Sequence, residues 1–113
     1  MSTTTRNRLQ KKLRALAEPR RLAILEVLRA GEARAGDIAG HFQLTRPAIS
    51  QHLRALLDAK LITERREGTS RFYRIRTEGF EDLRGFLDGF WKYRLASLKF
   101  AVEEEAVSKR RGR

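Results

Sequence analysis

The chain of 113 residues contains no cysteine, only two prolines and no long hydrophobic run. Without cysteine, disulfide frameworks, thiolate zinc sites and cysteine nucleophiles are excluded. No apolar stretch approaches the roughly 20 residues that a membrane-spanning helix needs. The first ten residues carry charges and no apolar segment, so we expect no secretory signal peptide. These absences lead us to expect a cytoplasmic protein with no membrane partner.

Acidic residues are also scarce. The chain has 14 Asp and Glu against 25 Lys and Arg, which gives a formal net charge of +11. Hydrophobic residues still make up 41% of the chain, enough for a folded core in one compact domain. The surplus of positive charge favours a polyanionic partner, and nucleic acid is the first candidate.

Apolar periodicity predicts a helix near the start of the chain. Leu9, Leu13 and Leu16 recur at helical spacing, after an unpatterned stretch over residues 1–5 that we expect to be disordered. Basic side chains, Lys12 among them, take the remaining faces of this helix.

Two further helices are predicted next. Pro19 suits the first turn of a second helix, and Gly31 follows its end, where glycine is favoured. A short third helix follows, from Ala33 or Ala35 to His41. These elements lead into a tight connection and a fourth helix.

The fourth helix is predicted from Arg46 to Ala59. Thr45 is a favourable residue for its N-cap, and Pro47 lies in its first turn, where a missing N–H costs nothing. A short helix, a brief turn and a second helix are typical of a helix-turn-helix.

After Ala59 the pattern changes from helical to alternating. Residues 61–66 and 71–76 read as two strands around a turn at 67–70, which predicts a β-hairpin. A long last helix rich in aromatic and leucine residues then reaches about Val107. We expect the basic tail over residues 108–113 to be disordered.

The element order predicts the fold class. Four helices, a two-stranded hairpin and a final helix make a mainly α domain with a small β-hairpin, the order of a winged helix-turn-helix. We expect this DNA-binding and dimerisation domain to span residues 6–107.

The fourth helix has two chemically different faces. Ile49, Leu53, Leu56 and Leu57 fall on one side at about 100° per residue, and polar side chains fall on the other. Arginine suits guanine, glutamine suits adenine and serine suits either base, although an ordinary solvated helix has a similar pattern. His52 lies at the flank, where it either reaches the DNA backbone or packs against a neighbour. The residues that we expect to contact DNA here are Thr45, Arg46, Pro47, Ser50, Gln51, His52 and Arg54.

The hairpin is unusually basic. Five arginines surround its glycine-containing turn, with Glu67 as an opposing charge, so the strand pair suits contact with phosphates or an adjacent minor groove. A solvated hairpin without a partner is the alternative. Tyr73 and Ile75 are expected to face inward, and Phe72 the other way. The hairpin residues that we expect to contact DNA are Arg65, Arg66, Thr69, Ser70 and Arg71.

Three motifs together resemble a known family. They are LAEPRRLAIL at residues 16–25, TRPAISQHL at 45–53, and LI at 61–62 followed by RREG at 65–68. Over residues 13–98 the chain resembles the bacterial ArsR-type (ArsR/SmtB-like) winged helix-turn-helix repressors. The resemblance implies a homodimer that binds a palindromic operator, with the first and last helices forming the dimer interface.

The sequence departs from the metal sensors of that family. Their thiolate pair would fall near residues 36–38, where there is no cysteine, and the last helix has no histidine. His41 and His52 are not in ligand spacing with each other. The resemblance is therefore to a Cys-free branch that does not sense metals, and we expect no metal and no other cofactor. The sequence does not identify an inducer.

The composition of the last helix supports a dimer independently. Its apolar surface exceeds what a domain of this size can cover, so a partner is expected to bury the rest. The alternative is a long helix that packs only on the first helix of the same chain. The expected interface residues are Leu9, Leu13, Leu16, Leu83, Leu87, Phe90, Trp91, Leu95 and Leu98.

We therefore predict a sequence-specific regulator that binds double-stranded DNA, a homodimeric repressor that could act on its own operon. A non-specific architectural nucleic-acid-binding protein is the main alternative, and a protein–protein adaptor is another. We expect no enzymatic activity, because the sequence shows no catalytic triad, phosphate-binding glycine loop or metal cluster.

Overall fold

A computed structural model describes the backbone of residues 1–111 and the side chains of residues 1–106. The chain forms two compact units, Met1–Asp82 and Leu83–Arg113. The first unit contains four helices and a small sheet, and the second contains most of the last helix. The expected winged helix-turn-helix, mainly helical with a small antiparallel sheet, is confirmed.

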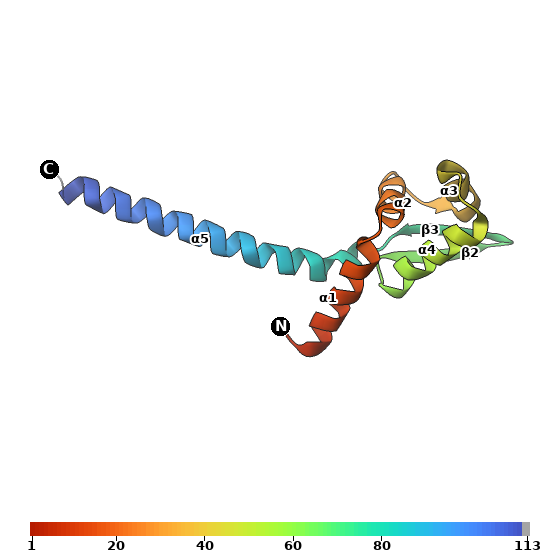
Figure 1. Cartoon of the computed structure of the whole chain (residues 1–113), viewed down its shortest axis with the longest axis horizontal. Coiled ribbons are helices and arrows are strands. Elements are labelled where there is room, and N and C mark those ends of the chain that lie inside the picture. The colour runs from red at the N-terminus through yellow and green to blue at the C-terminus, as the bar shows by residue number, and fades with distance from the viewer. Residues whose placement is uncertain (112–113) are drawn as a thin grey trace. The chain divides into compact units, whose positions relative to one another are not determined.

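The four helices of the first unit follow in chain order (Figure 1). They are α1 (Thr3–Leu16), α2 (Pro19–Arg29), α3 (Ala35–Phe42) and α4 (Arg46–Asp58). Helix α1 begins at Thr3, so the expected disorder over residues 1–5 is wrong for residues 3–5. The cause is local, since the hydroxyl of Ser2 accepts a hydrogen bond from the backbone N–H of Thr5 and caps the helix.

The sheet has three antiparallel strands in the order β1-β3-β2. Strands β2 (Ile62–Glu67) and β3 (Ser70–Ile75) form the predicted hairpin, and Gly68 provides the positive φ of +61° that its turn requires. Strand β1 (Ala33–Arg34) pairs with the other edge of β3. Strand β1 was not predicted from the sequence, because a two-residue strand has no detectable alternation and forms only through pairing with β3.

The core of the first unit holds α4 by its apolar face. Ile49, Leu53 and Leu56 are at most 1% exposed, as the predicted buried face requires, whereas Leu57 at its edge is half-buried. They share the core with Ile24 of α2 and Ile38 of α3, both fully buried. Burying a side chain of this size contributes about 1.5–3 kcal/mol, so the core fixes which side of α4 faces solvent.

Just after α4, Lys60 has a left-handed backbone conformation, and its carbonyl group lies against Gly79. Lys60 has a φ of +62°, and the next backbone N–H, that of Leu61, donates to the carbonyl of Leu56. The 3₁₀ turn η1 (Thr77–Phe80) brings Gly79 so close that a Cβ there would overlap the carbonyl oxygen of Lys60. Only glycine leaves room for this approach.

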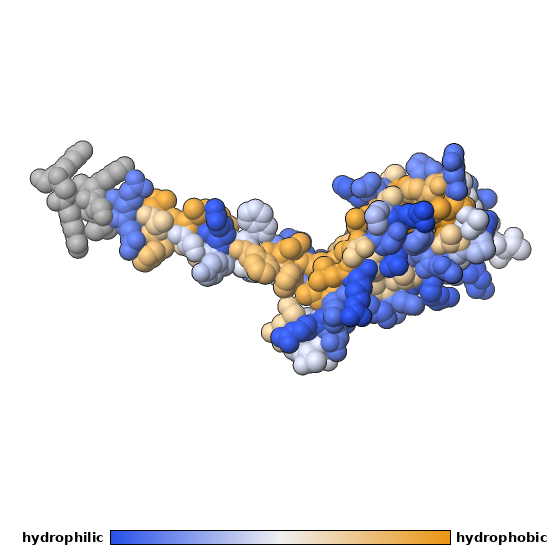
Figure 2. Space-filling model, in the orientation of Figure 1, coloured by the Kyte–Doolittle hydropathy of each residue, from blue (hydrophilic) through white to orange (hydrophobic). Residues whose placement is uncertain are grey.

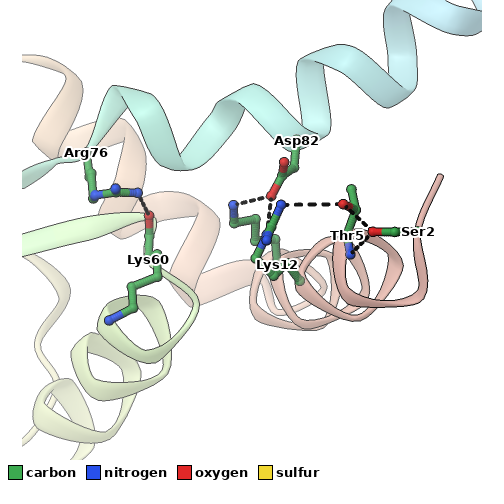
Figure 3. A network of polar contacts seen from close by, with 7 residues as sticks. Ser2, Thr5, Lys12, Lys60, Arg76 and Asp82 are labelled. Carbon is green, nitrogen blue, oxygen red and sulfur yellow. Dashed lines mark hydrogen bonds and ion pairs between the residues drawn. The ribbon is translucent and has the colours of Figure 1, made fainter.

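Lys12 is buried, although the helical pattern placed it among the solvated basic residues of α1. Its side chain is 6% exposed, and its ammonium donates to Asp82 at 2.9 Å (Figure 3). Arg8 donates to the same carboxylate oxygen at 3.3 Å. The hydrogen bond from Lys12, followed by that from Arg8, lowers the pKa of Asp82 below its ordinary value.

Changing Asp82 to Asn should destabilise the chain at pH 7, because the ammonium of Lys12 loses its counter-charge. We expect a loss of roughly 2 kcal/mol, which is smaller than the loss from breaking a fully buried ion pair. The pKa of Asp82 is lower in the folded chain than in the unfolded chain, where it is about 3.9. The ionised carboxylate therefore stabilises the fold fully above the unfolded pKa, and this stabilisation is lost as the pH falls through the lower folded pKa. Urea unfolding of both proteins from pH 7 to pH 3 should show the difference shrinking only at the acid end. Asp58→Asn, at an exposed carboxylate, is the control; an Asp82 effect independent of pH would contradict the ion pair.

The last helix, α5, spans Glu81–Arg111. It continues past Val107, where the sequence analysis ended it, and residues 112–113 of the expected tail lie outside the described residues. Hydrophobic residues recur along its visible surface (Figure 2). Among the described residues, no helix is both long and apolar enough to cross a membrane.

Candidate nucleic-acid interface

The outward face of α4 carries the polar side chains that the sequence predicted for DNA contact. Ser50, Gln51 and Arg54 are exposed, and so are Arg46 and Pro47 in the first turn. The buried residues of the same helix face the core, so the polar side is held outward by hydrophobic burial on the opposite side. Side chains of these types can hydrogen-bond to the edges of bases in a major groove.

A hollow of about 390 Å³ separates the start of α4 from the hairpin. It brings the tip of the hairpin next to the starts of the two consecutive helices α3 and α4. Three arginines and one aspartate contribute to its walls, so its net charge is positive. The lining residues are Arg34, Ala35, Gly36, Asp37, Arg46, Ser50, Thr69, Ser70, Arg71 and Tyr73.

Arg46 lies across the start of α3. A Cβ on Gly36 would be 3.1 Å from Nη1 of Arg46, a contact tighter than side chains ordinarily make. The glycine therefore leaves the guanidinium room beside the hollow. Thr45 caps α4, as the sequence predicted, because its hydroxyl accepts a hydrogen bond from the backbone N–H of Ala48.

The two faces of the hairpin carry different arginines. Arg66 and Arg71 are directly opposite each other, on the same face as the buried Tyr73 and on the side of the hollow. Arg65 and Arg74 belong to the other face, because successive side chains alternate along a strand. These arginines look alike in the sequence, and only the strand register separates them.

Arg65 is engaged by acidic neighbours. Its guanidinium donates to both carboxylate oxygens of Glu32, at 2.6 and 3.3 Å, and to Glu67 at 2.7 Å. It also lies 4.5 Å from the centre of the Phe72 ring. The hydrogen bond to Glu32 and then that to Glu67 raise the pKa of Arg65, and the same contact with Arg65 lowers the pKa of Glu32. Arg65 therefore connects the hairpin to the segment before β1.

Arg66 and Arg71 have weaker partners. Arg66 lies 3.5 Å and Arg71 4.0 Å from the same carboxylate oxygen of Glu64, and their side chains are 66% and 50% exposed. Exposed pairs of this length contribute about 0–1 kcal/mol, so a phosphate could replace Glu64 at low cost. These two arginines and the exposed Thr69 are the hairpin residues best placed for a polyanion.

His52 faces the interior of the first unit. Its side chain is 15% exposed, and its Nδ1 accepts a hydrogen bond from Arg21 of α2 at 3.4 Å. Of the two alternatives left by the sequence, the structure favours a neighbour within the protein over the DNA backbone. Helical position alone could not decide this, because the deciding contact comes from α2.

Arg34 is a candidate contact that the sequence analysis missed. It lines the hollow and lies 5.3 Å from the centre of the Phe72 ring. Its position depends on the pairing of β1 with β3, in which Arg34 is opposite Phe72. No local pattern in the sequence signals that pairing.

The residues expected at a dimer interface fall into two groups. Leu9 and Leu83 are buried in the single chain, at 4% and 8% exposure. Leu13, Leu87, Phe90, Trp91, Leu95 and Leu98 are exposed, between 45% and 65%. The second group is the one that remains available to another chain, and Leu16 is half-buried.

The described residues contain no group of three or more His, Asp or Glu side chains that could hold a metal ion. Neither histidine contributes to such a group. The polar chemistry of the interface therefore comes from arginine, serine, threonine and glutamine side chains, which hydrogen-bond to phosphates and base edges.

Comparisons with known proteins agree with this geometry. A family profile described as "Bacterial regulatory protein, arsR family" matches residues 18–64, which include the helix-turn-helix. The chain is 38% identical over 91 residues to the HTH-type transcriptional regulator Rv2034 of Mycobacterium tuberculosis, covering 80% of this chain and 85% of the relative. It is 39% identical over 69 residues to the transcriptional repressor SdpR of Bacillus subtilis, covering 61% of this chain and 77% of the relative.

A solved structure shares the fold. The homodimeric winged helix-turn-helix DNA-binding domain Mb0332 of Mycobacterium bovis superposes with a TM-score of 0.66 at 31% identity, covering 84% of this chain and 91% of that domain. The helix-turn-helix, the basic hairpin and these relatives together confirm the resemblance seen in the sequence motifs. This chain belongs to the ArsR family of bacterial transcriptional regulators.

Proposed function

We propose that a homodimer of this chain represses transcription by occupying a palindromic operator with two copies of α4. The observation that carries the proposal is the hollow in which the start of α4 faces Arg71 and the tip of the hairpin. Its polar, positively charged walls suit a DNA backbone that passes between a recognition helix and a wing. A regulator of this kind works where the genome lies, so we place it in the cytoplasm.

Helix α4 supplies the base readout in this proposal. Arg54 and Gln51 lie on its exposed face, where each can form two hydrogen bonds with a purine edge. Ser50 and Arg46 line the hollow at the start of the helix, where the unpaired backbone N–H groups also favour a phosphate. The predicted contacts from α4 are therefore kept, except that His52 faces α2. Thr45 accepts the capping hydrogen bond and is exposed, so its hydroxyl can still donate to a phosphate.

The hairpin supplies backbone contacts. Arg66 and Arg71 lie on the side of the hollow, 3.5 and 4.0 Å from a carboxylate oxygen of Glu64, and both side chains are exposed, so they can turn to phosphates. Thr69 and Ser70 add hydroxyl groups at the tip. Arg65 supports the hairpin through Glu32 and Glu67 and does not itself contact DNA in this proposal.

Dimerisation sets the spacing of the two recognition helices. SdpR is a repressor by name, and Mb0332 is described as a homodimer, and we extend both properties to this chain. The exposed apolar residues of α1 and α5 supply the interface, with Leu9 and Leu83 supporting it from within each chain. A twofold dimer would place its two α4 helices about 34–36 Å apart, or a multiple of that, which matches successive turns of DNA.

Two arginine variants test which residues contact bases and which contact phosphates. Arg54→Ala should weaken binding to the preferred operator by about 10- to 100-fold and relax the preference at one base pair, because a bidentate base contact is lost. Arg71→Ala should weaken binding to all duplexes alike and make the salt slope shallower by about 0.9. The operator would first be selected from random duplex DNA with purified protein, and affinities titrated at several salt concentrations.

Arg29→Ala is the matched control, since it removes the same charge from the end of α2, away from the hollow. If Arg54→Ala leaves operator affinity unchanged, the assigned face of α4 is wrong. If selection enriches no palindrome and all duplexes bind equally, the chain is a non-specific DNA-binding protein.

A further inference from the structure

A cluster of polar side chains connects helices α1, α2 and α4. Arg21 of α2 donates from Nε to Nδ1 of His52 at 3.4 Å and from Nη1 to the carbonyl of Ala15 in α1, also at 3.4 Å. Glu18 accepts from the backbone N–H of Arg21 at 3.0 Å and caps α2. The same Glu18 oxygen lies 3.8 Å from Nδ1 of His52. One arginine therefore joins the end of α1, the start of α2 and the side of α4.

We infer that the contact between Arg21 and His52 sets the fine rotation of α4 about its axis, within the range that its buried apolar face allows, and so aims Gln51 and Arg54 without touching DNA. His52 is the only polar side chain of α4 for which the described residues supply a hydrogen bond from another helix. The rest of the buried side is aliphatic, and aliphatic contacts are not directional. A hydrogen bond is directional, so this contact can define the angle at which the exposed residues meet a groove.

The contact requires an unprotonated Nδ1. With a proton there, the imidazole has no lone pair for Arg21 and faces a guanidinium of the same charge. Protonated His52 would instead be drawn to Glu18, which would compete with the cap of α2. In the described residues, the charged groups in contact with His52 are Glu18 and Arg21, and α1, α3 and β2 contribute no ion pair or side-chain hydrogen bond to it.

This arrangement predicts the sign of a pH effect. Protonation disturbs the contact, so operator affinity should fall as the pH is lowered from 7.5 to 5.5 at constant salt. A histidine that touched a phosphate would behave in the opposite way, since its positive charge would strengthen binding. The direction of the change therefore distinguishes a positioning residue from a DNA contact.

Variants of His52 and Arg21 provide the test. His52→Asn keeps an acceptor close to the position of Nδ1 but does not titrate, so it should bind near the wild-type affinity at pH 7.5 and lose most of the pH dependence. His52→Ala and Arg21→Ala should each weaken binding about tenfold at pH 7.5, the size of one lost hydrogen bond. For His52→Ala the salt slope should stay at the wild-type value, because no phosphate contact is removed.

His41→Asn is the matched control, because His41 is the other histidine of the chain and is exposed on α3. It should keep the wild-type pH profile. Affinity that rises on acidification, or a shallower salt slope for His52→Ala, would overturn the inference in favour of a phosphate contact. An unchanged affinity for His52→Ala would overturn it as well.

The inference rests on the proposed role of α4, and the experiments separate the two. If Arg54→Ala loses binding while the His52 variants behave like the wild type, the positioning role of His52 is wrong and the proposed function of α4 stands. Circular dichroism and sedimentation of each variant check folding and assembly. If His52→Ala does not fold, the pH profile of His52→Asn still decides.

Discussion

Replacing Gly79 with alanine is expected to destabilise the first unit by more than about 3 kcal/mol, the range of severe overpacking against backbone. The new Cβ would overlap the carbonyl oxygen of Lys60 and lie 2.9 Å from its carbon and 3.3 Å from Cα of Leu61. None of these atoms belongs to a flexible side chain. Lys60 closes α4 in a left-handed conformation, and Leu61 is fully buried, so neither can move without disturbing the core.

Thermal and urea unfolding would measure this loss. Gly40→Ala is the control, because Gly40 lies inside α3 and a Cβ there would have no neighbour within 4 Å. It should be neutral or stabilise by up to about 1 kcal/mol through better helix propensity. Equal stability of the two variants would show that η1 does not approach Lys60 in this way.

The second large effect is expected from α5. Changing Trp91 and Leu95 together to glutamate should convert the dimer to monomers, because both residues are more than 60% exposed in the single chain and lie one turn apart on one side of the helix. A monomer has one recognition helix, so operator affinity should fall about 100-fold or more as the second half-site contact is lost. Sedimentation velocity and operator titration on the same samples would show both changes.

A matched control must add the same negative charge to the same helix. Tyr93→Glu with Ser97→Glu does this on the side of α5 roughly opposite Trp91 and Leu95, given about 100° per residue. This pair should remain dimeric. If the control pair dissociates and the test pair stays dimeric, the interface lies on the other face of α5 and the predicted residues are wrong.

Much of the fold could be predicted because its signals are local. The period of α4 separates Ile49 and Leu53 from Arg54, and the structure buries the first two and exposes the third. The alternation after Ala59 and the glycine at 68 likewise predicted the hairpin. In each case hydrophobic burial selects one face, and the repeat of the element determines which residues share it.

The roles of individual charged residues could not be predicted in the same way. Arg65 and Arg71 look alike in the sequence, but Arg65 meets Glu32, 33 positions away in the chain. Lys12 is paired with a carboxylate 70 positions away, at Asp82. A long basic side chain reaches whichever acceptor the fold brings near it, and the distance along the chain contains no information about that acceptor.

The sequence by itself determined the winged helix-turn-helix, the family and the polar face of α4, because helical and strand periods and short motifs depend on neighbouring residues. Only the tertiary structure decided that Arg65 supports the hairpin, that His52 faces α2 and that Gly79 lies against Lys60. These facts depend on contacts between elements distant in the chain. Such contacts form when the core is buried, and their partners are fixed by the fold as a whole.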